Sequence, residues 1–111
     1  MKGLETLKRS REFDSAYSHG SKWHASAFVL FYRPFKEKKV GFTVSKKVGN
    51  AVKRNFAKRR LRALYQQYSS YLKEGVLVIV AKAPLLELEF DLLERDFIHA
   101  AKKLKILNEK V

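Results

Sequence analysis

A stretch without acidic residues, from Glu37 to Glu74, constrains the fold of this chain more than any other feature. Between these two residues lie eleven Lys and Arg residues, together with apolar residues at steps of three and four, the spacing of one helix face. That face comprises Ala57, Leu61, Leu64, Tyr65, Tyr68 and Leu72. We therefore predict a long helix that packs its apolar face on a sheet and exposes a strongly basic face.

Local signals set the ends of this basic helix. Asn50 follows Gly49 and belongs to the residue types preferred at helix N-caps. The pattern continues for about twenty residues to Tyr71 or Leu72, and Gly75 is the type of residue that commonly stops a helix. The basic helix is therefore expected over residues 50–72.

The other elements alternate between helix and strand patterns. A first helix is expected from the N-cap candidate Ser10 to His19, with Gly20 in the left-handed position that ends many helices. Strands are expected at residues 25–33, 39–45 and 76–81, and a last helix at 90–105. The order is α-β-β-α-β-α, with residues 22–24 as a candidate for a further short strand. We predict an α/β chain with the layers of an α+β sandwich.

The faces of these elements indicate where the core lies. Residues 76–81 form a continuous apolar run, which is typical of a strand covered on both faces. Residues 39–45 have one apolar side, and residues 25–33 are partly apolar on both. The last helix has an apolar stripe of Phe90, Leu93, Phe97, Ala100, Ala101 and Leu104.

Composition limits the class of protein. The chain has 111 residues, which suits one domain over residues 1–111, and 24 Lys and Arg against 11 Asp and Glu give a formal net charge of +13. This charge predicts a polyanionic partner, either nucleic acid or an anionic membrane surface. No apolar run approaches the roughly 20 residues that span a bilayer. Without cysteine there is no disulfide, thiolate nucleophile or cysteine zinc site. The first eight residues lack a secretory pattern, so a cytoplasmic protein is expected.

The basic face of the long helix is the strongest functional signal. Arg54, Lys58 and Arg62 form a row at i, i+4 and i+8, and Arg59 lies beside them. Guanidinium groups bind phosphate oxygens through paired donors, and Asn50 and Asn55 add neutral polar groups. The alternative is a solvated helix face, but such faces usually interleave Glu with Lys, so we favour a polyanion-binding surface. Arg54 falls close to the apolar arc, and we expect it to line a groove.

Groups for catalysis are missing from the pattern. Metal-dependent cleavage of nucleic acid needs clustered carboxylates, and metal-free cleavage needs a general acid and base. His19, His24 and His99 are scattered without metal-ligand spacing, and no Walker pattern follows Gly49. No catalytic residue, protein-bound metal or protein-bound cofactor is therefore expected, and a self-sufficient nuclease is disfavoured.

A second candidate surface is aromatic. Phe13 and Tyr17 are four residues apart on the first helix, and Phe31 lies on a strand that this helix could cover. Such rings can stack unpaired bases, or they can simply fill the core. The two interpretations differ in the exposure of the rings.

Taken in order, these residues resemble the bacterial ribonuclease P protein family. The likeness rests on the run Ser45-Lys46-Lys47-Val48-Gly49-Asn50-Ala51-Val52 followed by Arg54-Asn55, Lys58-Arg59 and Arg62. It extends over nearly the whole chain, through Leu7-Lys8, Phe13, Tyr17, His19-Gly20, Phe28-Val29-Leu30 and Ala81-Lys82-Ala83-Pro84.

The resemblance implies a sandwich with a sheet of about four strands and an uncommon left-handed crossover around the basic helix. It implies a partner, the catalytic RNA of ribonuclease P, which holds the Mg²⁺ ions, with one protein per RNA. It also implies a role in removing the 5′ leader of precursor tRNA. The positions matched to catalytic-RNA binding are Lys46, Lys47, Asn50, Arg54, Asn55, Lys58, Arg59 and Arg62. Those matched to a leader-binding cleft are Phe13, Tyr17 and Phe31, with Val29 and Thr43 as neighbours.

Two positions depart from the family pattern, because Tyr17 stands where Phe is frequent and Phe31 where Tyr is frequent. Ring stacking survives either exchange. Three other interpretations stay open: a general RNA-binding module such as a ribosomal protein, a self-sufficient ribonuclease, and a membrane-surface binder. The last is disfavoured because the apolar face of the basic helix is needed for the core.

Overall fold

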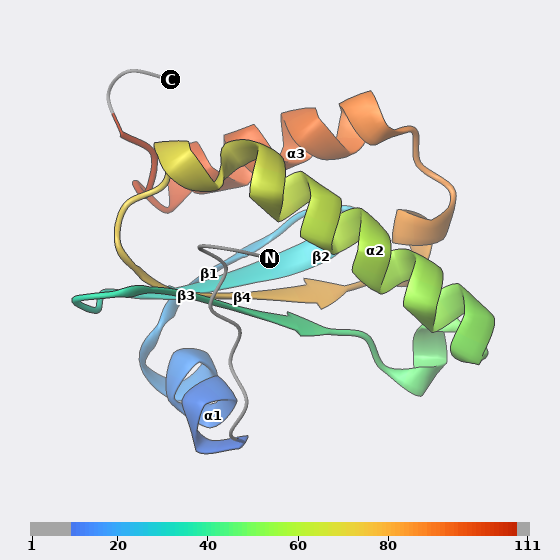
Figure 1. The fold of residues 1–111 in the computed structure, drawn as a ribbon, viewed down its shortest axis with the longest axis horizontal. Helices are drawn as coiled ribbons and strands as arrows, with labels where there is room; N and C mark the ends of the chain where they lie inside the picture. The colour runs from blue at the N-terminus through green and yellow to red at the C-terminus, as the bar shows by residue number, and fades with distance from the viewer. Residues whose placement is uncertain (1–9, 109–111) are drawn as a thin grey trace.

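A four-stranded sheet between helices organises residues 10–108, the part of the chain that this computed structural model describes (Figure 1). In chain order the elements are α1 (Ser10–His19), β1 (Ser21–His24), β2 (Phe28–Arg33), β3 (Lys38–Thr43), the 3₁₀ helix η1 (Lys46–Val48), α2 (Ala51–Tyr68), η2 (Ser69–Tyr71), β4 (Gly75–Ala81), η3 (Ala83–Leu86) and α3 (Phe90–Lys103). Helices α2 and α3 cover one face of the sheet, and α1 lies on the other (Figure 1). The expected α+β sandwich is confirmed.

The strand order is β1-β2-β4-β3, so β4, the last strand in sequence, lies in the interior of the sheet. It is antiparallel to β2 and parallel to β3. Figure 1 shows the chain leaving β3 at the front of the sheet, returning through α2 above it and entering β4 behind β3. The β3-α2-β4 connection is therefore left-handed, against the usual rule for parallel crossovers.

The core lies mainly between the sheet and the two long helices. On α2, Ala57, Leu61, Leu64 and Tyr65 are buried, with Tyr68 packed at the margin, as the apolar repeat predicts. The stripe of α3 is buried at Leu93, Phe97, Ala100 and Ala101. A smaller cluster on the opposite face joins Ala16 of α1 to Val76 and Val78 of β4. β4 is thus covered on both faces, which explains its unbroken apolar run.

Several predicted boundaries need correction. The expected strand 25–33 begins only at Phe28, and the candidate short strand at 22–24 is real as β1. β3 ends at Thr43 rather than at residue 45, and α3 ends at Lys103, with Lys105 in the left-handed region at φ 61°. The basic helix ends at Tyr68 and continues to Tyr71 only as a 3₁₀ turn. Leu7 and Lys8 lie outside the described residues.

Two glycines have other roles than those expected. Gly20 is not left-handed; a side chain there would meet the Ala16 carbonyl oxygen at 2.4 Å and that of Tyr32 at 2.8 Å, so close backbone approach requires glycine. Gly75 does not end α2. It begins β4 at φ 148°, where the ring of Tyr32 fills the space that a side chain would need.

Candidate RNA interface

The basic face extends from η1 along α2 as far as Arg62. Asn50 caps the helix, because its Oδ1 accepts a hydrogen bond from the Lys53 amide at 3.0 Å. Val48 in η1 is buried and anchors the preceding loop to the core. We call the eight residues predicted to bind catalytic RNA the basic band: Lys46, Lys47, Asn50, Arg54, Asn55, Lys58, Arg59 and Arg62. All are exposed except Arg54, which is half-buried.

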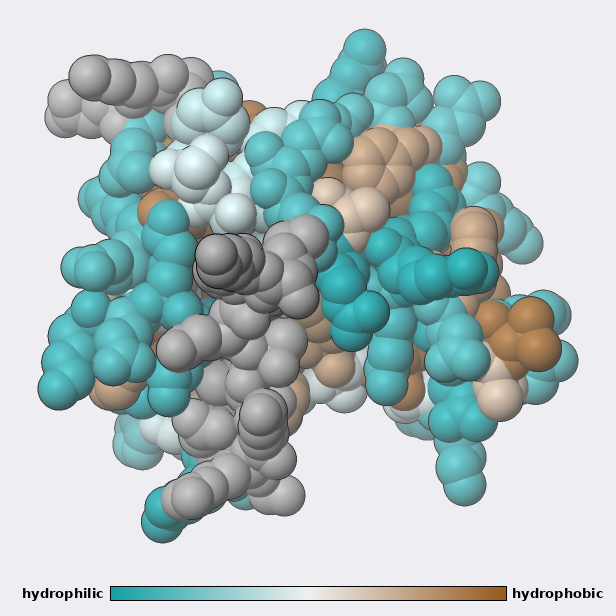
Figure 2. Space-filling model, viewed as in Figure 1, coloured by the Kyte–Doolittle hydropathy of each residue, from teal (hydrophilic) through white to brown (hydrophobic). Residues whose placement is uncertain are grey.

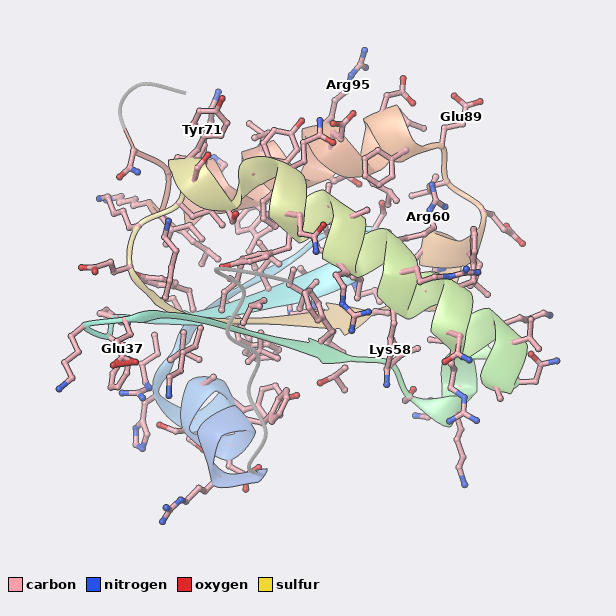
Figure 3. All side chains as sticks on the ribbon, in the orientation of Figure 1. Glu37, Lys58, Arg60, Tyr71, Glu89 and Arg95 are labelled. Carbon is pink, nitrogen blue, oxygen red and sulfur yellow. The ribbon has the colours of Figure 1, made fainter. Side chains whose placement is uncertain are left out.

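Two arginines of the basic band, Arg54 and Arg62, pack against other residues of the protein rather than extending into solvent. The Nε of Arg54 is buried and has no hydrogen-bond partner among the described residues, so Arg54 lies against the fold, as its position near the apolar arc predicts. The guanidinium of Arg62 lies 5.8 Å from the centre of the Phe42 ring. Figure 3 shows Lys58 pointing from α2 past the end of β3.

Within residues 10–108, no carboxylate pairs with the cations of the basic band. Among the described side chains, none of its Lys and Arg residues forms an ion pair. The acids of the last third bind elsewhere: Glu94 accepts hydrogen bonds from Tyr68 and Gln67, and Asp96 accepts one from Ser26 at 3.0 Å. The cations therefore remain available to a polyanion.

Arg60 lies outside this surface. Its Nη1 donates to the Leu85 carbonyl oxygen at 2.8 Å, and its guanidinium packs near the rings of Phe56 and Phe90 at 5.5 and 6.0 Å (Figure 3). It ties α2 to η3 and to the start of α3. Arg60 is not among the residues predicted to bind RNA, and its contacts give it a structural role.

Two apolar residues beside the basic band were missed. Val52 is 77% exposed and Phe56 is 40% exposed, one helical turn apart on α2. In Figure 2, hydrophilic side chains predominate over the first turns of α2, with a small hydrophobic patch among them. The i, i+4 spacing outside the buried stripe is the signal that could have identified this pair.

The predicted aromatic residues gather on the opposite face of the sheet. The rings of Tyr17 and Phe31 meet edge to face with centroids 4.8 Å apart, and Phe13 follows Tyr17 at 6.4 Å. The Tyr17 hydroxyl lies 3.2 Å from Thr43 Oγ1. Tyr17 is 37% exposed and Phe13 and Phe31 are half-buried, so these rings both pack and present surface.

Strand register explains why one end of this face stays open. Val29, Val80 and Thr43 form one cross-strand row, and Phe31, Val78 and Gly41 form the next. Ala16 covers Val76 and Val78, whereas Val80 and Thr43 remain half-exposed and Val29 is 8% exposed. We call Phe13, Tyr17, Val29, Phe31 and Thr43 the aromatic site.

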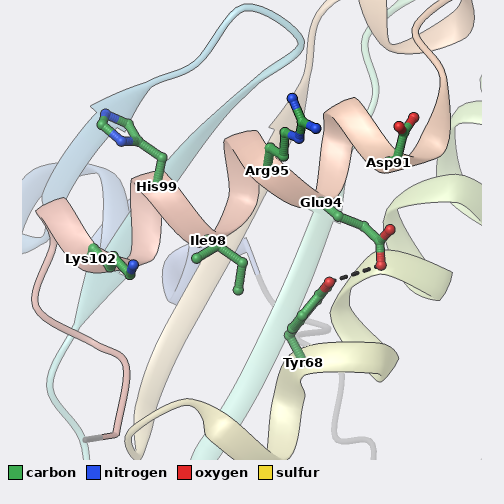
Figure 4. Close-up of a pocket in the computed structure, with 7 residues that line it drawn as sticks. All are labelled: Tyr68, Asp91, Glu94, Arg95, Ile98, His99 and Lys102. Atoms are coloured by element: carbon green, nitrogen blue, oxygen red, sulfur yellow. Dashed lines mark hydrogen bonds between the residues drawn. The ribbon is translucent and has the colours of Figure 1, made fainter. Parts of the chain in front are cut away.

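A shallow groove of about 490 Å³ lies on the other side of the molecule, between α3 and the end of α2 (Figure 4). Its lining has both signs of charge, from Tyr68, Asp91, Glu94, Arg95, Ile98, His99 and Lys102. The Tyr68 hydroxyl donates to Glu94 Oε2 at 2.8 Å. Burial, followed by this hydrogen bond and the negative charge of Glu94, raises the pKa of Tyr68. This mixed charge does not suit a polyanion.

The described residues contain no group of three or more His, Asp or Glu side chains that could hold a metal ion. His99 instead packs against Trp23, with ring centroids 5.6 Å apart. None of the helices within the described residues is long and apolar enough to cross a membrane.

A cationic band with no ion-pair partner in the described part of the chain, on one side, and half-exposed rings on the other define a small, basic RNA-binding protein. Comparison with known proteins agrees. The family model Ribonuclease P matches residues 1–105. The ribonuclease P protein component of a Nitratiruptor species is 47% identical over 105 residues, covering 95% of this chain and 96% of that relative.

Further comparisons lead to the same family. The component from Halalkalibacterium halodurans is 34% identical over 115 residues and covers 100% of this chain and 97% of that relative. The solved RNase P protein of Staphylococcus aureus superposes with a TM-score of 0.83 at 26% identity, over 95% of this chain and 99% of that one. The chain belongs to the ribonuclease P protein family.

Proposed function

We propose that this chain acts in ribonuclease P by holding RNA on two surfaces, the catalytic RNA on the basic band and the precursor tRNA leader on the aromatic site. As a member of its family it is a protein subunit of an endoribonuclease that removes the 5′ leader of precursor tRNA, and its partner is the ribonuclease P RNA.

The basic band supports the first half of this proposal. Its cations have no carboxylate partners among the described residues, so binding RNA does not require breaking internal ion pairs. Each neutralised phosphate releases counterions and makes binding salt-dependent. The free amides of the α2 N-terminus add attraction for phosphate close to Asn50.

The aromatic site supports the second half. An exposed Tyr17 ring against Phe31, above the open row of Val80 and Thr43, offers a platform for unpaired bases. Stacking on such rings contributes about 1–3 kcal/mol per base and tolerates many sequences. A single-stranded leader is the part of the substrate that such a surface suits.

Chemistry on the RNA completes the proposal. We assign bond cleavage to the RNA and to none of the described residues, and we expect the Mg²⁺ ions on the RNA. We also expect one protein per RNA, in the cytoplasm. Family membership removes the ribosomal-protein alternative. The apolar face of α2 lies in the core, which argues against membrane binding through this helix.

The test compares two substrates on the reconstituted holoenzyme. Phe31→Leu removes the ring but keeps an apolar side chain beside Val78, and Phe31→Tyr keeps the ring. We expect Phe31→Leu to weaken binding of precursor tRNA about fivefold or more, with little change for mature tRNA, and Phe31→Tyr to bind both normally. Equal loss for both substrates would refute the leader assignment.

A further inference from the structure

An exposed aromatic ring lies at the far end of the sheet, in the β2–β3 connection. Phe35 is 36% exposed, and two cations flank its ring, Arg33 at 5.4 Å and Lys39 at 5.7 Å from its centroid. An exposed ring between cations is the arrangement that binds a base by stacking while holding nearby phosphate. Neither the basic band nor the aromatic site includes these residues.

Strand register places Phe35 on the same face of the sheet as the aromatic site. Arg33 and Lys39 both pair with Val76, whose side chain packs under Ala16 of α1. Because side chains alternate along strands, Arg33 and Lys39 share the face of Phe31 and Val78. The ring that they flank therefore lies toward that face, about 13 Å along the chain from Phe31 if the four intervening steps are extended.

Arg33 has one donor atom for which the described part of the chain offers no acceptor. Its Nε is buried and has no hydrogen-bond partner among the described residues, although the residue as a whole is half-buried. A buried donor without a partner costs free energy that an acceptor from a ligand can recover. An acceptor on a nucleotide stacked on Phe35 reaches this donor when the Arg33 side chain turns outward, which the half-buried position of the residue allows.

The two ends of this face have different neighbours. Thr43, at the end of β3, leads directly into η1 and the basic band, which we assign to the catalytic RNA. Phe35 lies at the opposite end of the strands, where β2 leads into β3. A leader that starts at the catalytic RNA and crosses Tyr17 and Phe31 therefore reaches Phe35 only with its more distal nucleotides.

We propose that Phe35, Arg33 and Lys39 form a second stacking site that binds leader nucleotides upstream of those held in the aromatic site. The inference rests on the proposed leader binding and extends it to a dependence on leader length. Acidic Glu37 in the same connection is exposed, so the site gains affinity from stacking more than from net charge. The salt dependence of binding should then be the same with and without the Phe35 ring.

The experiment measures precursor tRNA affinity for holoenzyme reconstituted with Phe35→Ala, Phe35→Tyr or the natural chain. Three substrates are used. They are mature tRNA, a precursor tRNA whose short leader reaches only as far as Phe31, and a precursor tRNA whose longer leader continues past Phe31. Tyr71→Ala is the matched control, because Tyr71 is a 43% exposed ring outside all three surfaces. Thermal melting checks that each variant is folded.

We expect Phe35→Ala to weaken binding of the long-leader precursor about fivefold or more. The affinities for the short-leader precursor and for mature tRNA, and the slope of log affinity against log salt, should not change. Phe35→Tyr should bind like the natural chain. No loss on the long leader, or the same loss on all substrates, overturns the second site. If Phe31→Leu also fails to discriminate leader from mature tRNA, the proposed function fails as well, so the two failures are distinguishable.

Discussion

The hydroxyl of Tyr17 lies 3.2 Å from Thr43 Oγ1 and joins α1 to the last residue of β3. The next segment of the chain is the loop that carries Lys46 and Lys47, so this contact lies at the junction of the aromatic site and the basic band. It also assigns the hydroxyl of Tyr17, at a position where the family often has Phe, a partner within the protein.

Replacing Tyr17 separates its ring from its hydroxyl. The hydrogen bond between the Tyr17 hydroxyl and Thr43 Oγ1 is exposed. We therefore expect Tyr17→Phe to lower the unfolding free energy by at most about 1 kcal/mol and to leave the affinity for the leader unchanged. Tyr17→Leu removes the ring and should weaken leader binding about fivefold or more. Titration of reconstituted holoenzyme with precursor and mature tRNA checks both variants; a large loss of leader affinity with Tyr17→Phe would contradict a stacking role.

Arg59 and Arg62 test the basic band. Each alanine variant removes a charged donor set, and we expect assembly with the ribonuclease P RNA to weaken about tenfold. The slope of log affinity against log salt should become shallower for each phosphate that is no longer neutralised, by about 0.7 if that phosphate lies on a single strand. Arg95→Ala is the control, because Arg95 is an exposed arginine on α3 (Figure 3). A loss with Arg95→Ala as large as with Arg59→Ala would mean that only total charge matters.

Asn50 combines a structural and a functional role. Its side chain caps α2, so Asn50→Ala should lower the unfolding free energy by about 1 kcal/mol. Asn50→Asp keeps the cap but places a negative charge in the basic band, and should weaken RNA assembly while leaving stability nearly intact. Denaturant unfolding and RNA titration are measured side by side. If Asn50→Asp assembles normally, Asn50 is only a cap.

Tyr65 makes stability sensitive to high pH. Burial raises the pKa of Tyr65 above its ordinary value of 10.0, because the phenolate would be desolvated beside the core. Its contribution is complete below pH 10.0 and is lost as the pH rises through the raised pKa. Above pH 10.0, we expect the unfolding free energy to fall less steeply in Tyr65→Phe than in the natural chain. Identical pH profiles would show that Tyr65 is not a source of the alkaline loss.

Periodic burial explains which parts of the fold are predictable. The stripes of α2 and α3 and the run in β4 follow from the residues, because a helix or strand must bury one continuous apolar surface. Boundaries depend on tertiary contacts instead. The sequence pattern predicts helix stops at Gly20 and Gly75. In the structure, the close approach of backbone atoms requires glycine at position 20, and the Tyr32 ring requires it at position 75.

The site is predictable to a similar degree. Missing acids indicate an unpaired basic band, and the resemblance to the family groups Phe13, Tyr17 and Phe31. The role of Arg60 depends on a carbonyl of Leu85, which is 25 residues away and visible only after folding. Phe35 was not predicted because its two flanking cations lie on β2 and β3, which β4 separates in the sheet, and approach the ring only in the folded chain.

We infer that this chain binds RNA and leaves bond cleavage to its partner RNA. Turnover of precursor tRNA at low magnesium, measured with bacterial ribonuclease P RNA alone, with this chain alone and with both, tests it most directly. We predict efficient leader removal only when both are present. Leader removal by the purified chain without RNA, or no stimulation of the RNA by the chain, would contradict the claim.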